Sequence, residues 1–422
     1  MKVTIINKSD STGGAAIVSR RLTEALRAAG IEASMLVAEK LSDFPWVTQT
    51  ASPKREKIPF LAERLKIFIH NGFNRSDLFK VDTASDGLPL WNHPLVKEAD
   101  VICLNWVNQG FLALKGVERI LQTGKPVVWT MHDMWNMTGI CHHAGHCLNW
   151  EKECGNCRFL GSKSSPRDIS HKVWLRKHAI CEKATSSSSV KLHFVAVSNW
   201  LAQLARRSSL LSSASLSVIP NAFPLPPAPP GHAPHDKFRI VMGAARLDDP
   251  IKGLPILVKA TQLLKQLHPD EARRMELITF GAVRNQEALD GIGIAHRHLG
   301  MLHGESNIRR VYLNSDAVVS ASLYETLPGT LVEGLAYGCI PVSFNRGGQS
   351  DIVTHLDTGY IAEFDPDITT AASNLCNGIL WSFNHADEDM RIKMYNSALK
   401  KFDSQVIAGE YIKLFSHLLE QG

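Results

Sequence analysis

The 422-residue sequence has no long hydrophobic run. None of its apolar stretches approaches the roughly 18 residues that a membrane-spanning helix requires, so we expect no such helix. The opening residues, MKVTIINK, are too short an apolar segment for a signal peptide, because polar residues interrupt them at once. Together these absences predict a cytoplasmic protein.

Strong compositional bias is also missing. Hydrophobic residues make up 44% of the chain and charged residues 21%, which is ordinary for a globular protein, and the length suits two or three domains. The charge is divided unevenly: residues 1–235 hold 28 Lys and Arg against 18 Asp and Glu (+10), and residues 236–422 hold 18 against 23 (−5), which sums to +5. A basic first half suits anionic lipid headgroups or a lipid diphosphate, although an accident of surface composition explains it equally well. We expect no nucleic-acid partner.

What the chain does contain is an alternation of predicted strands and helices. Lys2–Asn7 is predicted to be a strand, Ala15–Ala29 a helix and Ala33–Ala38 the next strand, which is how a Rossmann-like half begins. The first loop holds Gly13 and Gly14 but lacks the full Gly-x-Gly-x-x-Gly pattern. The pair either lets a ligand approach the backbone or only makes a tight turn.

The alternation stops at a proline-rich segment, which indicates a stiff linker, and restarts at Phe238–Ala244. The sequence therefore predicts an α/β protein with two facing Rossmann-like domains and a cleft between them. The expected parts are an N-terminal, acceptor-side domain (1–222), a linker (223–236), a C-terminal nucleotide-sugar domain (237–400) and a last helix (401–422) that can cross back onto the first domain.

The central stretch of the second half is SASLYETLPGTLVEGLAYGCIPV, residues 320–342. It follows an apolar strand, carries Glu325 on a loop, and continues into a helix with Pro328 in its first turn and Gly338 at its end. Unpaired N–H groups at a helix start attract a diphosphate, and a nearby carboxylate such as Glu333 can accept bonds from two ribose hydroxyls. The alternative is that both glutamates are solvated surface charges.

The order Glu-x7-Glu, with a proline between and Gly-x-x-Pro-Val after, resembles the signature of the retaining glycosyltransferases of family 4, which have the GT-B fold. The resemblance implies that Glu333 holds the nucleotide ribose and that Glu325 lies near the donor sugar. It also implies that the helix start binds the donor through Pro328, Gly329, Thr330 and Leu331.

Cations and glycines elsewhere in the chain extend the resemblance. Arg246 and Lys252 follow a predicted strand and can offer positive charge to phosphate oxygens. The resemblance implies that they grip the donor diphosphate, as an arginine and a lysine do in the family. The alternative is that both lie on a solvated loop. The family places a glycine pair under the donor phosphates, which corresponds to Gly13 and Gly14. Gly281, after the strand at 276–280, is expected to admit the nucleotide close to the backbone.

His132 ends the predicted strand at 126–132, where side chains of a parallel sheet point into the ligand crevice. The family commonly has a histidine here that contacts the donor sugar, and a structural role is the alternative. No Asp-x-Asp stands at a strand end where a metal–diphosphate bridge would be expected. Cations and a helix start can neutralise the leaving diphosphate instead, so we expect no cofactor for catalysis.

Four of the eight cysteines, Cys141, Cys147, Cys154 and Cys157, fall within 17 residues. The Cys-x2-Cys end suits one tetrahedral ion, and a cytoplasmic setting disfavours lasting disulfides. We interpret the segment as a structural zinc knuckle, with His142, His143 or His146 as substitutes for one thiolate; disulfides and free thiols are the alternatives. The block from Thr130 to Cys157 resembles a family 4 subgroup of colanic-acid-type exopolysaccharide transferases. This resemblance implies that residues 139–161 are an insertion over the acceptor cleft.

Basic and apolar residues interleave between 52 and 80. A basic amphipathic helix of this kind either lies on an anionic membrane surface or packs on its own domain. Membrane contact would make the protein peripheral on the inner membrane face.

The sequence thus predicts a retaining glycosyltransferase that moves a sugar from a nucleotide-diphosphate donor to a saccharide or lipid-linked saccharide in polysaccharide biosynthesis. One alternative keeps the fold but makes the protein a nucleotide-sugar epimerase or hydrolase, which would need no acceptor. Another is a non-catalytic assembly protein, which would bind no donor.

Overall fold

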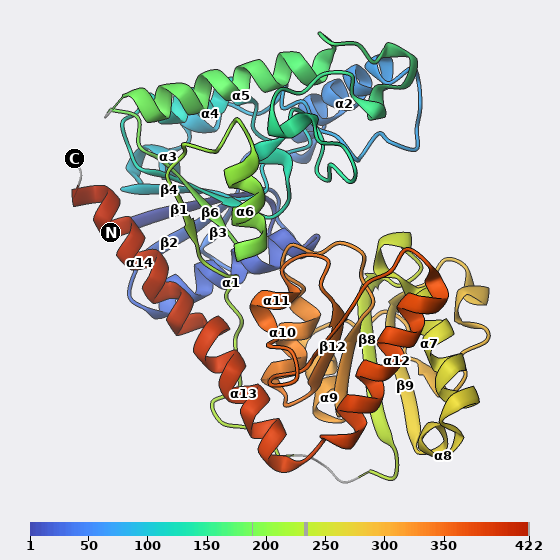
Figure 1. The fold of residues 1–422 in the computed structure, drawn as a ribbon. Helices are drawn as coiled ribbons and strands as arrows, with labels where there is room; N and C mark the ends of the chain where they lie inside the picture. The colour runs from blue at the N-terminus through green and yellow to red at the C-terminus, as the bar shows by residue number, and fades with distance from the viewer. Residues whose placement is uncertain (188, 232–234, 421–422) are drawn as a thin grey trace. The chain divides into compact units, whose positions relative to one another are not determined.

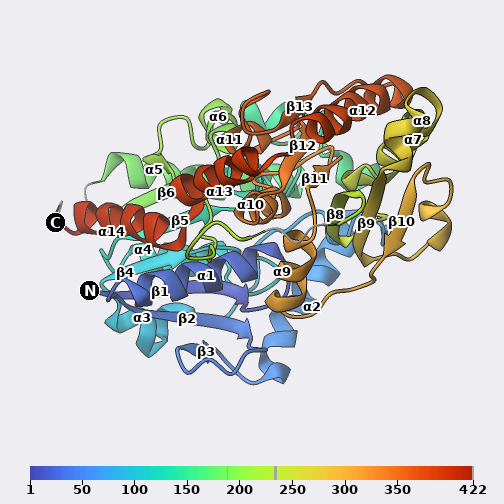
Figure 2. The same cartoon turned by 90° about the horizontal axis from the view of Figure 1, so that it is seen from below.

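The computed structural model describes residues 1–187, 189–231 and 235–420. The chain forms two compact units: Met1–Ala222 together with Ser404–Gly422, and Phe223–Asp403 (Figures 1 and 2). Each unit holds one parallel sheet with helices on both faces, which confirms the two predicted Rossmann-like halves.

The first unit is built on a seven-stranded sheet of order β3-β2-β1-β4-β5-β6-β7, in which every pair is parallel. Its strands are β1 (Lys2–Ser9), β2 (Glu32–Glu39), β3 (Val47–Gln49), β4 (Val101–Leu104), β5 (Val127–Met131), β6 (Leu192–Ala196) and β7 (Leu216–Val218). Its helices are α1 (Gly14–Ala28), α2 (Pro53–His70), α3 (Pro94–Glu98), α4 (Leu114–Leu121), α5 (Ile169–Ser186), α6 (Asn199–Arg207) and α14 (Ser404–Glu420).

The second unit has a six-stranded parallel sheet of order β10-β9-β8-β11-β12-β13. Its strands are β8 (Phe238–Arg246), β9 (Met275–Ala282), β10 (Ala295–His298), β11 (Ala317–Ser320), β12 (Ile340–Phe344) and β13 (Tyr360–Ala362). Its helices are α7 (Leu254–Leu267), α8 (Pro269–Arg273), α9 (Glu305–Leu313), α10 (Gly329–Ala336), α11 (Gln349–Ile352), α12 (Ile368–Asn384) and α13 (Glu388–Phe402).

Alternate residues of the strands fill two separate apolar cores, because successive side chains of a strand point to opposite faces of a sheet. In the first unit, α1 and α14 pack over β1, β2 and β4, and Leu26, Met35 and Phe415 are fully buried there. In the second unit, α7 and α12 pack together over Ile240, Val319 and their neighbours. The helix α10 lies on the other face of that sheet, where Gly334 makes a close approach to Val318.

The predicted linker, 223–236, is part of the second unit rather than a free spacer, apart from residues 232–234, which lie outside the described residues. The Phe223 N–H donates to the Phe402 carbonyl at 2.9 Å, and the Tyr395 hydroxyl donates to the Pro226 carbonyl at 2.8 Å. Both hydrogen bonds join the proline-rich segment to α13. The unit ends at Asp403, and the last helix, Ser404–Glu420, belongs to the first unit.

Among the helices in the described part of the chain, none combines the length and the apolar character needed to cross a membrane.

Candidate functional site

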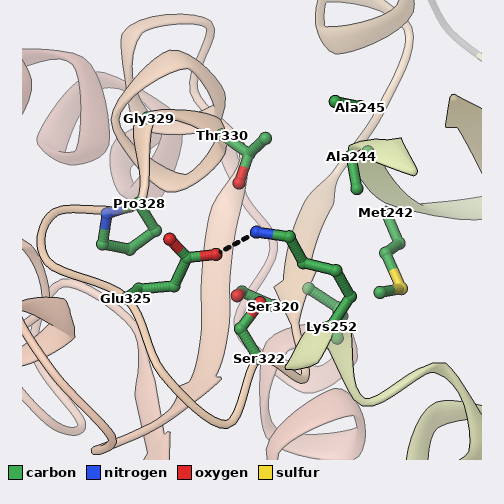
Figure 3. A pocket seen from close by; sticks show the side chains of 12 residues that line it. Met242, Ala244, Ala245, Lys252, Ser320, Ser322, Glu325, Pro328, Gly329 and Thr330 are labelled. Carbon is green, nitrogen blue, oxygen red and sulfur yellow. Dashed lines mark hydrogen bonds and ion pairs between the residues drawn. The ribbon is translucent and has the colours of Figure 1, made fainter. Parts of the chain in front are cut away.

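A pocket of about 140 Å³ opens in the second unit where β8 and β11 end (Figure 3). Carboxyl ends of neighbouring parallel strands share one edge of the sheet, and ligands of such sheets bind there. The lining comes from the end of β8, the loops that follow β8 and β11, and the start of α10. It comprises Met242, Gly243, Ala244, Ala245, Lys252, Val319, Ser320, Ser322, Glu325, Pro328, Gly329 and Thr330.

Lys252 and Glu325 face each other across this pocket (Figure 3), with 2.5 Å between Lys252 Nζ and Glu325 Oε1. Both side chains are about one-quarter exposed, at 27% and 21%, so solvent and a ligand can reach the pair. The two loops are held together by backbone contact. The Leu323 N–H donates to the Ile251 carbonyl at 2.8 Å. A Cβ on Gly253 would lie 2.0 Å from the Ala321 carbonyl oxygen, so only glycine allows this approach.

The loop of Glu325 is also braced from β12. Glu325 and Gly347 form a parallel bridge, and the Gly348 N–H donates to the Glu325 carbonyl at 2.9 Å. A Cβ on Gly347 would meet that same carbonyl oxygen at 1.7 Å. This glycine pair therefore positions the Glu325 backbone, a role that sequence reasoning missed.

The start of α10 contributes Pro328, Gly329 and Thr330 to the pocket. Pro328 is the N-cap residue and the helix begins at Gly329, so the prediction that Pro328 lies in the first turn was off by one position. The first N–H groups of a helix have no partner within it, and those of α10 lie beside Lys252. Leu331 is buried one position further on and, among the described residues, does not line the pocket.

Glu333 and Arg246 lie outside the described lining of the pocket. Glu333 is partly buried one turn into α10. Arg246 pairs with carboxylates of its own turn, at 3.5 Å from Asp248 and 2.9 Å from Asp249. Of the two predicted phosphate-binding cations, the structure thus brings only Lys252 to the start of α10.

Gly281 has a packing reason that the sequence did not reveal. A Cβ there would lie 1.8 Å from the Ala244 carbonyl oxygen on the neighbouring strand, and its φ of +126° disfavours other residues. The glycine is therefore required by the contact between β8 and β9.

In the first unit, His132 follows β5 and is partly buried. Its Nε2 lies 2.9 Å from Asn105 Oδ1, and a carboxamide oxygen only accepts, so Nε2 donates and Nδ1 carries no proton. Burial lowers the pKa of His132 to about 4, partly offset by the charge of Asp133, so the ring is neutral near pH 7. A small cavity of about 10 Å³ beside it is lined by residues of α1, α14 and the segment 220–222.

Gly13 caps α1 with a φ of +90°, which glycine adopts readily, and Gly14 is the first residue of the helix. A Cβ on either glycine would meet no atom within 4 Å. Open space therefore borders this helix start, and the role of the pair in donor binding stays a prediction.

Behind His132, a buried chain of charges ties the insertion to the rest of the unit. His142 donates from Nδ1 to Asp133 and from Nε2 to Asp82, each at 2.7 Å. Burial alone would lower the pKa of His142, but the two carboxylates raise it to about 10, so the ring is an imidazolium. For Asp133 the two effects have the opposite signs: burial alone would raise its pKa, but the charge of His142 lowers it to about 2. Asp82 in turn pairs with Arg64 of α2.

The four clustered cysteines do not form a metal site as placed. Each is a free thiol, and the described residues contain no group of three or more His, Cys, Asp or Glu side chains that could hold a metal ion. Burial raises the pKa of Cys141 to about 11 and those of Cys154 and Cys157 to about 12, which favours the thiol form without a metal. The zinc knuckle gains no support from this geometry and stays a prediction.

Comparison with known proteins agrees with the site in the second unit. Residues 229–376 match the family "Glycosyl transferases group 1". The part of the chain that contains the pocket therefore has the sequence pattern of a group 1 glycosyltransferase. Group 1 corresponds to family 4, so the match confirms the predicted resemblance to family 4 for residues 229–376.

Individual relatives are distant. Over 95 residues the chain is 30% identical to WcaC of Escherichia coli (strain K12), named for colanic acid biosynthesis and glycosyl transfer; the match spans 21% of each chain. The sucrose-phosphate synthase of Thermosynechococcus elongatus superposes with a TM-score of 0.67 at 16% identity over the full length of both chains. HepE of Anabaena, crystallised with UDP and glucose, does so with a TM-score of 0.59 at 16% identity, over 99% of this chain and 100% of that one. These structures show that the fold is GT-B.

Proposed function

We propose that the protein is a retaining glycosyltransferase that uses a nucleoside diphosphate sugar, with a UDP-sugar such as UDP-glucose as the donor. The observation that carries the proposal is the Lys252–Glu325 pair beside the start of α10. It places a cation, a carboxylate and a helix N-terminus around one pocket, which suits a diphosphate joined to a sugar. HepE, which shares the fold, was crystallised with UDP and glucose.

In the donor complex, the diphosphate lies at the start of α10 and competes with Glu325 for the Lys252 ammonium. Two phosphates carry more negative charge than one carboxylate, so Lys252 moves toward the donor. Glu325 then accepts a hydrogen bond from a sugar hydroxyl and orients the sugar. Glu333, further along α10, binds the ribose. Arg246 has to leave Asp248 and Asp249 to reach the phosphates, so it contributes less than Lys252.

The reaction replaces one bond at the anomeric carbon. The acceptor hydroxyl attacks on the face from which the diphosphate departs, the bond between the anomeric carbon and the phosphate oxygen breaks, and the hydroxyl proton passes to a phosphate oxygen. Configuration is therefore retained. The Lys252 ammonium and the N–H groups of α10 stabilise the charge that develops on the diphosphate. We propose that this transfer needs no divalent ion, and full activity in the presence of a chelator would support that.

The acceptor is a saccharide or a lipid-linked saccharide of polysaccharide biosynthesis, bound by the first unit. Two observations support this part: the excess of Lys and Arg in residues 1–235 and the similarity to WcaC, named for colanic acid biosynthesis. His132, whose ring is neutral near pH 7, follows β5 in this unit and contacts the transferred sugar or the acceptor.

The test is a calorimetric screen of UDP-, GDP- and ADP-sugars, followed by variants measured with the sugar that binds. Lys252→Gln should weaken donor binding about tenfold or more, because a charge-assisted hydrogen bond is worth about 1.5–3 kcal/mol. Glu325→Gln should bind the donor at least as well, since Lys252 is released from its ion pair, but lose turnover. Lys265→Gln, an exposed lysine of α7, is the matched control and should change neither quantity.

Two results would overturn the proposal. One is that no nucleotide sugar binds the intact chain. The other is that the Lys252 and Glu325 variants match the Lys265 control in both binding and turnover. Product formed from the donor alone, with no acceptor and with the sugar inverted at a ring carbon, would identify an epimerase instead.

A further inference from the structure

The helix α2 buries three of its charged side chains and leaves four of its apolar side chains in solvent. Glu56, Glu63 and Arg64 are 8%, 0% and 5% exposed. Ile58, Leu61, Leu65 and Ile69 are 68%, 60%, 58% and 46% exposed. Their spacing of three, four and four residues places these four side chains on one side of the helix. An ordinary surface helix of a globular protein has the opposite arrangement.

The buried charges of α2 are hydrogen-bonded, so the helix cannot roll to cover its apolar side. Glu63 accepts N–H bonds from Thr83 at 2.9 Å and Ala84 at 2.6 Å. Arg64 pairs with Asp82 and donates to the Leu78 carbonyl at 2.6 Å. Turning the helix would break these bonds and leave the buried N–H groups of Thr83 and Ala84 without an acceptor, at about 1–3 kcal/mol each.

Two more large apolar side chains are exposed in the segment that follows the helix. Phe73 and Phe79 are 63% and 57% exposed, and with the four aliphatic residues they form what we call the α2 stripe: Ile58, Leu61, Leu65, Ile69, Phe73 and Phe79. Among the residues that the structure describes, six of the 19 exposed large hydrophobic side chains thus fall within 22 consecutive positions. Single exposed apolar residues need no explanation, whereas a concentration of this kind marks an interaction surface.

The charges around the α2 stripe identify the partner. Between residues 54 and 80, all of which the structure describes, no acidic side chain is exposed: Glu56 and Glu63 are buried and Asp77 is partly buried. The exposed cations in the same range are Lys54, Arg55, Lys57, Lys66, Arg75 and Lys80. Two of them have acidic partners, Lys66 with Asp86 and Lys80 with Asp77. A second copy of the chain would set like charges against each other, whereas an anionic lipid surface complements both the cations and the apolar side chains.

We infer that the α2 stripe docks the protein on the surface of a membrane that contains anionic lipids. The apolar side chains enter the boundary between headgroups and acyl chains, and the surrounding cations contact phosphate groups. Neither the apolar side chains nor the cations suffice alone. A few exposed apolar side chains bind a membrane weakly, and salt screens the attraction between cations and lipid phosphates. The α2 stripe shares no residue with the pocket of the second unit, so the inference does not depend on the sugar that the enzyme transfers.

The experiment is co-sedimentation of the full chain with vesicles of phosphatidylcholine alone or mixed with phosphatidylglycerol. We expect binding to the mixed vesicles at low salt, weakened at high salt, and little binding to phosphatidylcholine alone. The double variant Leu61→Ser/Leu65→Ser should lower the partition coefficient about tenfold or more, as should Lys54→Gln/Lys57→Gln/Arg75→Gln, because each cation near an anionic surface adds about 1 kcal/mol.

Matched controls remove equal exposed area or equal charge elsewhere. Leu41→Ser/Leu267→Ser replaces leucines that are 61% and 58% exposed, against 60% and 58% for Leu61 and Leu65. Lys115→Gln/Lys265→Gln/Lys400→Gln removes three exposed cations outside the 54–80 range. Both controls should bind vesicles as the unchanged chain does. All replaced side chains are exposed, so thermal unfolding should stay unchanged and show that lost binding is not lost folding.

Three outcomes would overturn the inference. The first is no binding to mixed vesicles at low salt. The second is binding that the α2 variants and the control variants reduce equally. The third is a dimer in solution that Leu61→Ser/Leu65→Ser dissociates, because the stripe would then be covered by a second copy of the chain.

Discussion

Gly347 shows how a residue without a side chain determines where a charged one lies. Its backbone passes so close to Glu325 that an added Cβ would meet the Glu325 carbonyl oxygen at 1.7 Å. Neither residue suggests this contact in the sequence, because 22 positions separate them and the contact is between backbones. The glycine therefore belongs to the site although it contributes no chemistry of its own.

We predict that Gly347→Ala lowers the free energy of unfolding by about 1–3 kcal/mol, the usual cost of forcing extra atoms into a packed region. It should also reduce turnover of the donor sugar, since the loop of Glu325 has to move. Denaturant unfolding and a transfer assay measure the two effects. Gly409→Ala in α14, where a Cβ would meet no atom within 4 Å, is the control: it should leave turnover unchanged and raise the free energy of unfolding by about 1 kcal/mol at most, because alanine favours a helix over glycine. A Gly347→Ala protein with wild-type stability and turnover would contradict the contact.

The low pKa of His132 predicts that the free energy of unfolding depends on pH in acid. In the unfolded chain a histidine binds a proton below about pH 6.5, whereas burial lowers the pKa of His132 in the folded chain to about 4. Between these values the unfolded state binds more protons, so the free energy of unfolding falls as the pH is lowered from 6.5 to 4. The full effect is up to about 3 kcal/mol, at 1.36 kcal/mol for each pKa unit.

The measurement compares denaturant unfolding of the unchanged chain and of His132→Gln at several pH values. Burial also lowers the pKa of His193 to about 4, so both proteins lose stability toward acid, and only the difference between them reports on His132. We expect that difference to change between pH 6.5 and 4 and to stay constant from pH 7 to 8. A constant difference over the whole range would show that His132 titrates normally.

At the scale of elements, helix α10 and its flanking strands could be predicted well and the insertion could not. The signals for α10 are local: an apolar run before it, glycine after it with a φ of +79°, and Ile340–Phe344 as the next strand. The insertion has no such periodicity. Its shape depends on distant partners such as Asp82, which contacts His142 from 60 positions away.

Zinc content tests the remaining prediction for the insertion. A structural site of four thiolates should bring close to one zinc per chain in protein purified without chelator, and chelation should then lower the thermal stability of the first unit. Thiols as the structure places them predict almost no zinc and no effect of a chelator. Metal analysis decides, and less than about half a zinc per chain would count against the knuckle.

At the scale of the whole molecule, the end of the chain completes the core of its beginning. Helix α14 buries Tyr411 and Phe415 against α1 and the first sheet, and the hydroxyls of Thr130 and Tyr411 lie 3.0 Å apart, 281 positions apart in sequence. The first unit can therefore reach its full stability only after the second unit has been synthesised.

We predict that Phe415→Ala destabilises the first unit by about 3–5 kcal/mol, because it opens a cavity at a fully buried site. Hydrogen exchange should show lost protection in β1 and β2 while β8 and β11 keep theirs. Leu419→Ala, at a position 37% exposed on the same helix, is the control and should cost far less. Equal loss of protection in both sheets would mean that the two units unfold as one.

The two parallel α/β halves, the helix that Gly338 follows, and the carboxylate and lysine that meet in the pocket of the second unit could all be predicted from the residues alone. These follow from local periodicity, from turn residues, and from the rule that strand ends share one edge of a parallel sheet. Contacts between distant segments place Lys252 rather than Arg246 opposite Glu325. They also give Gly281 and Gly347 their backbone contacts and turn the apolar side of α2 to solvent. Those outcomes depend on which distant groups satisfy each charge and carbonyl, and spacing along the chain does not contain that information.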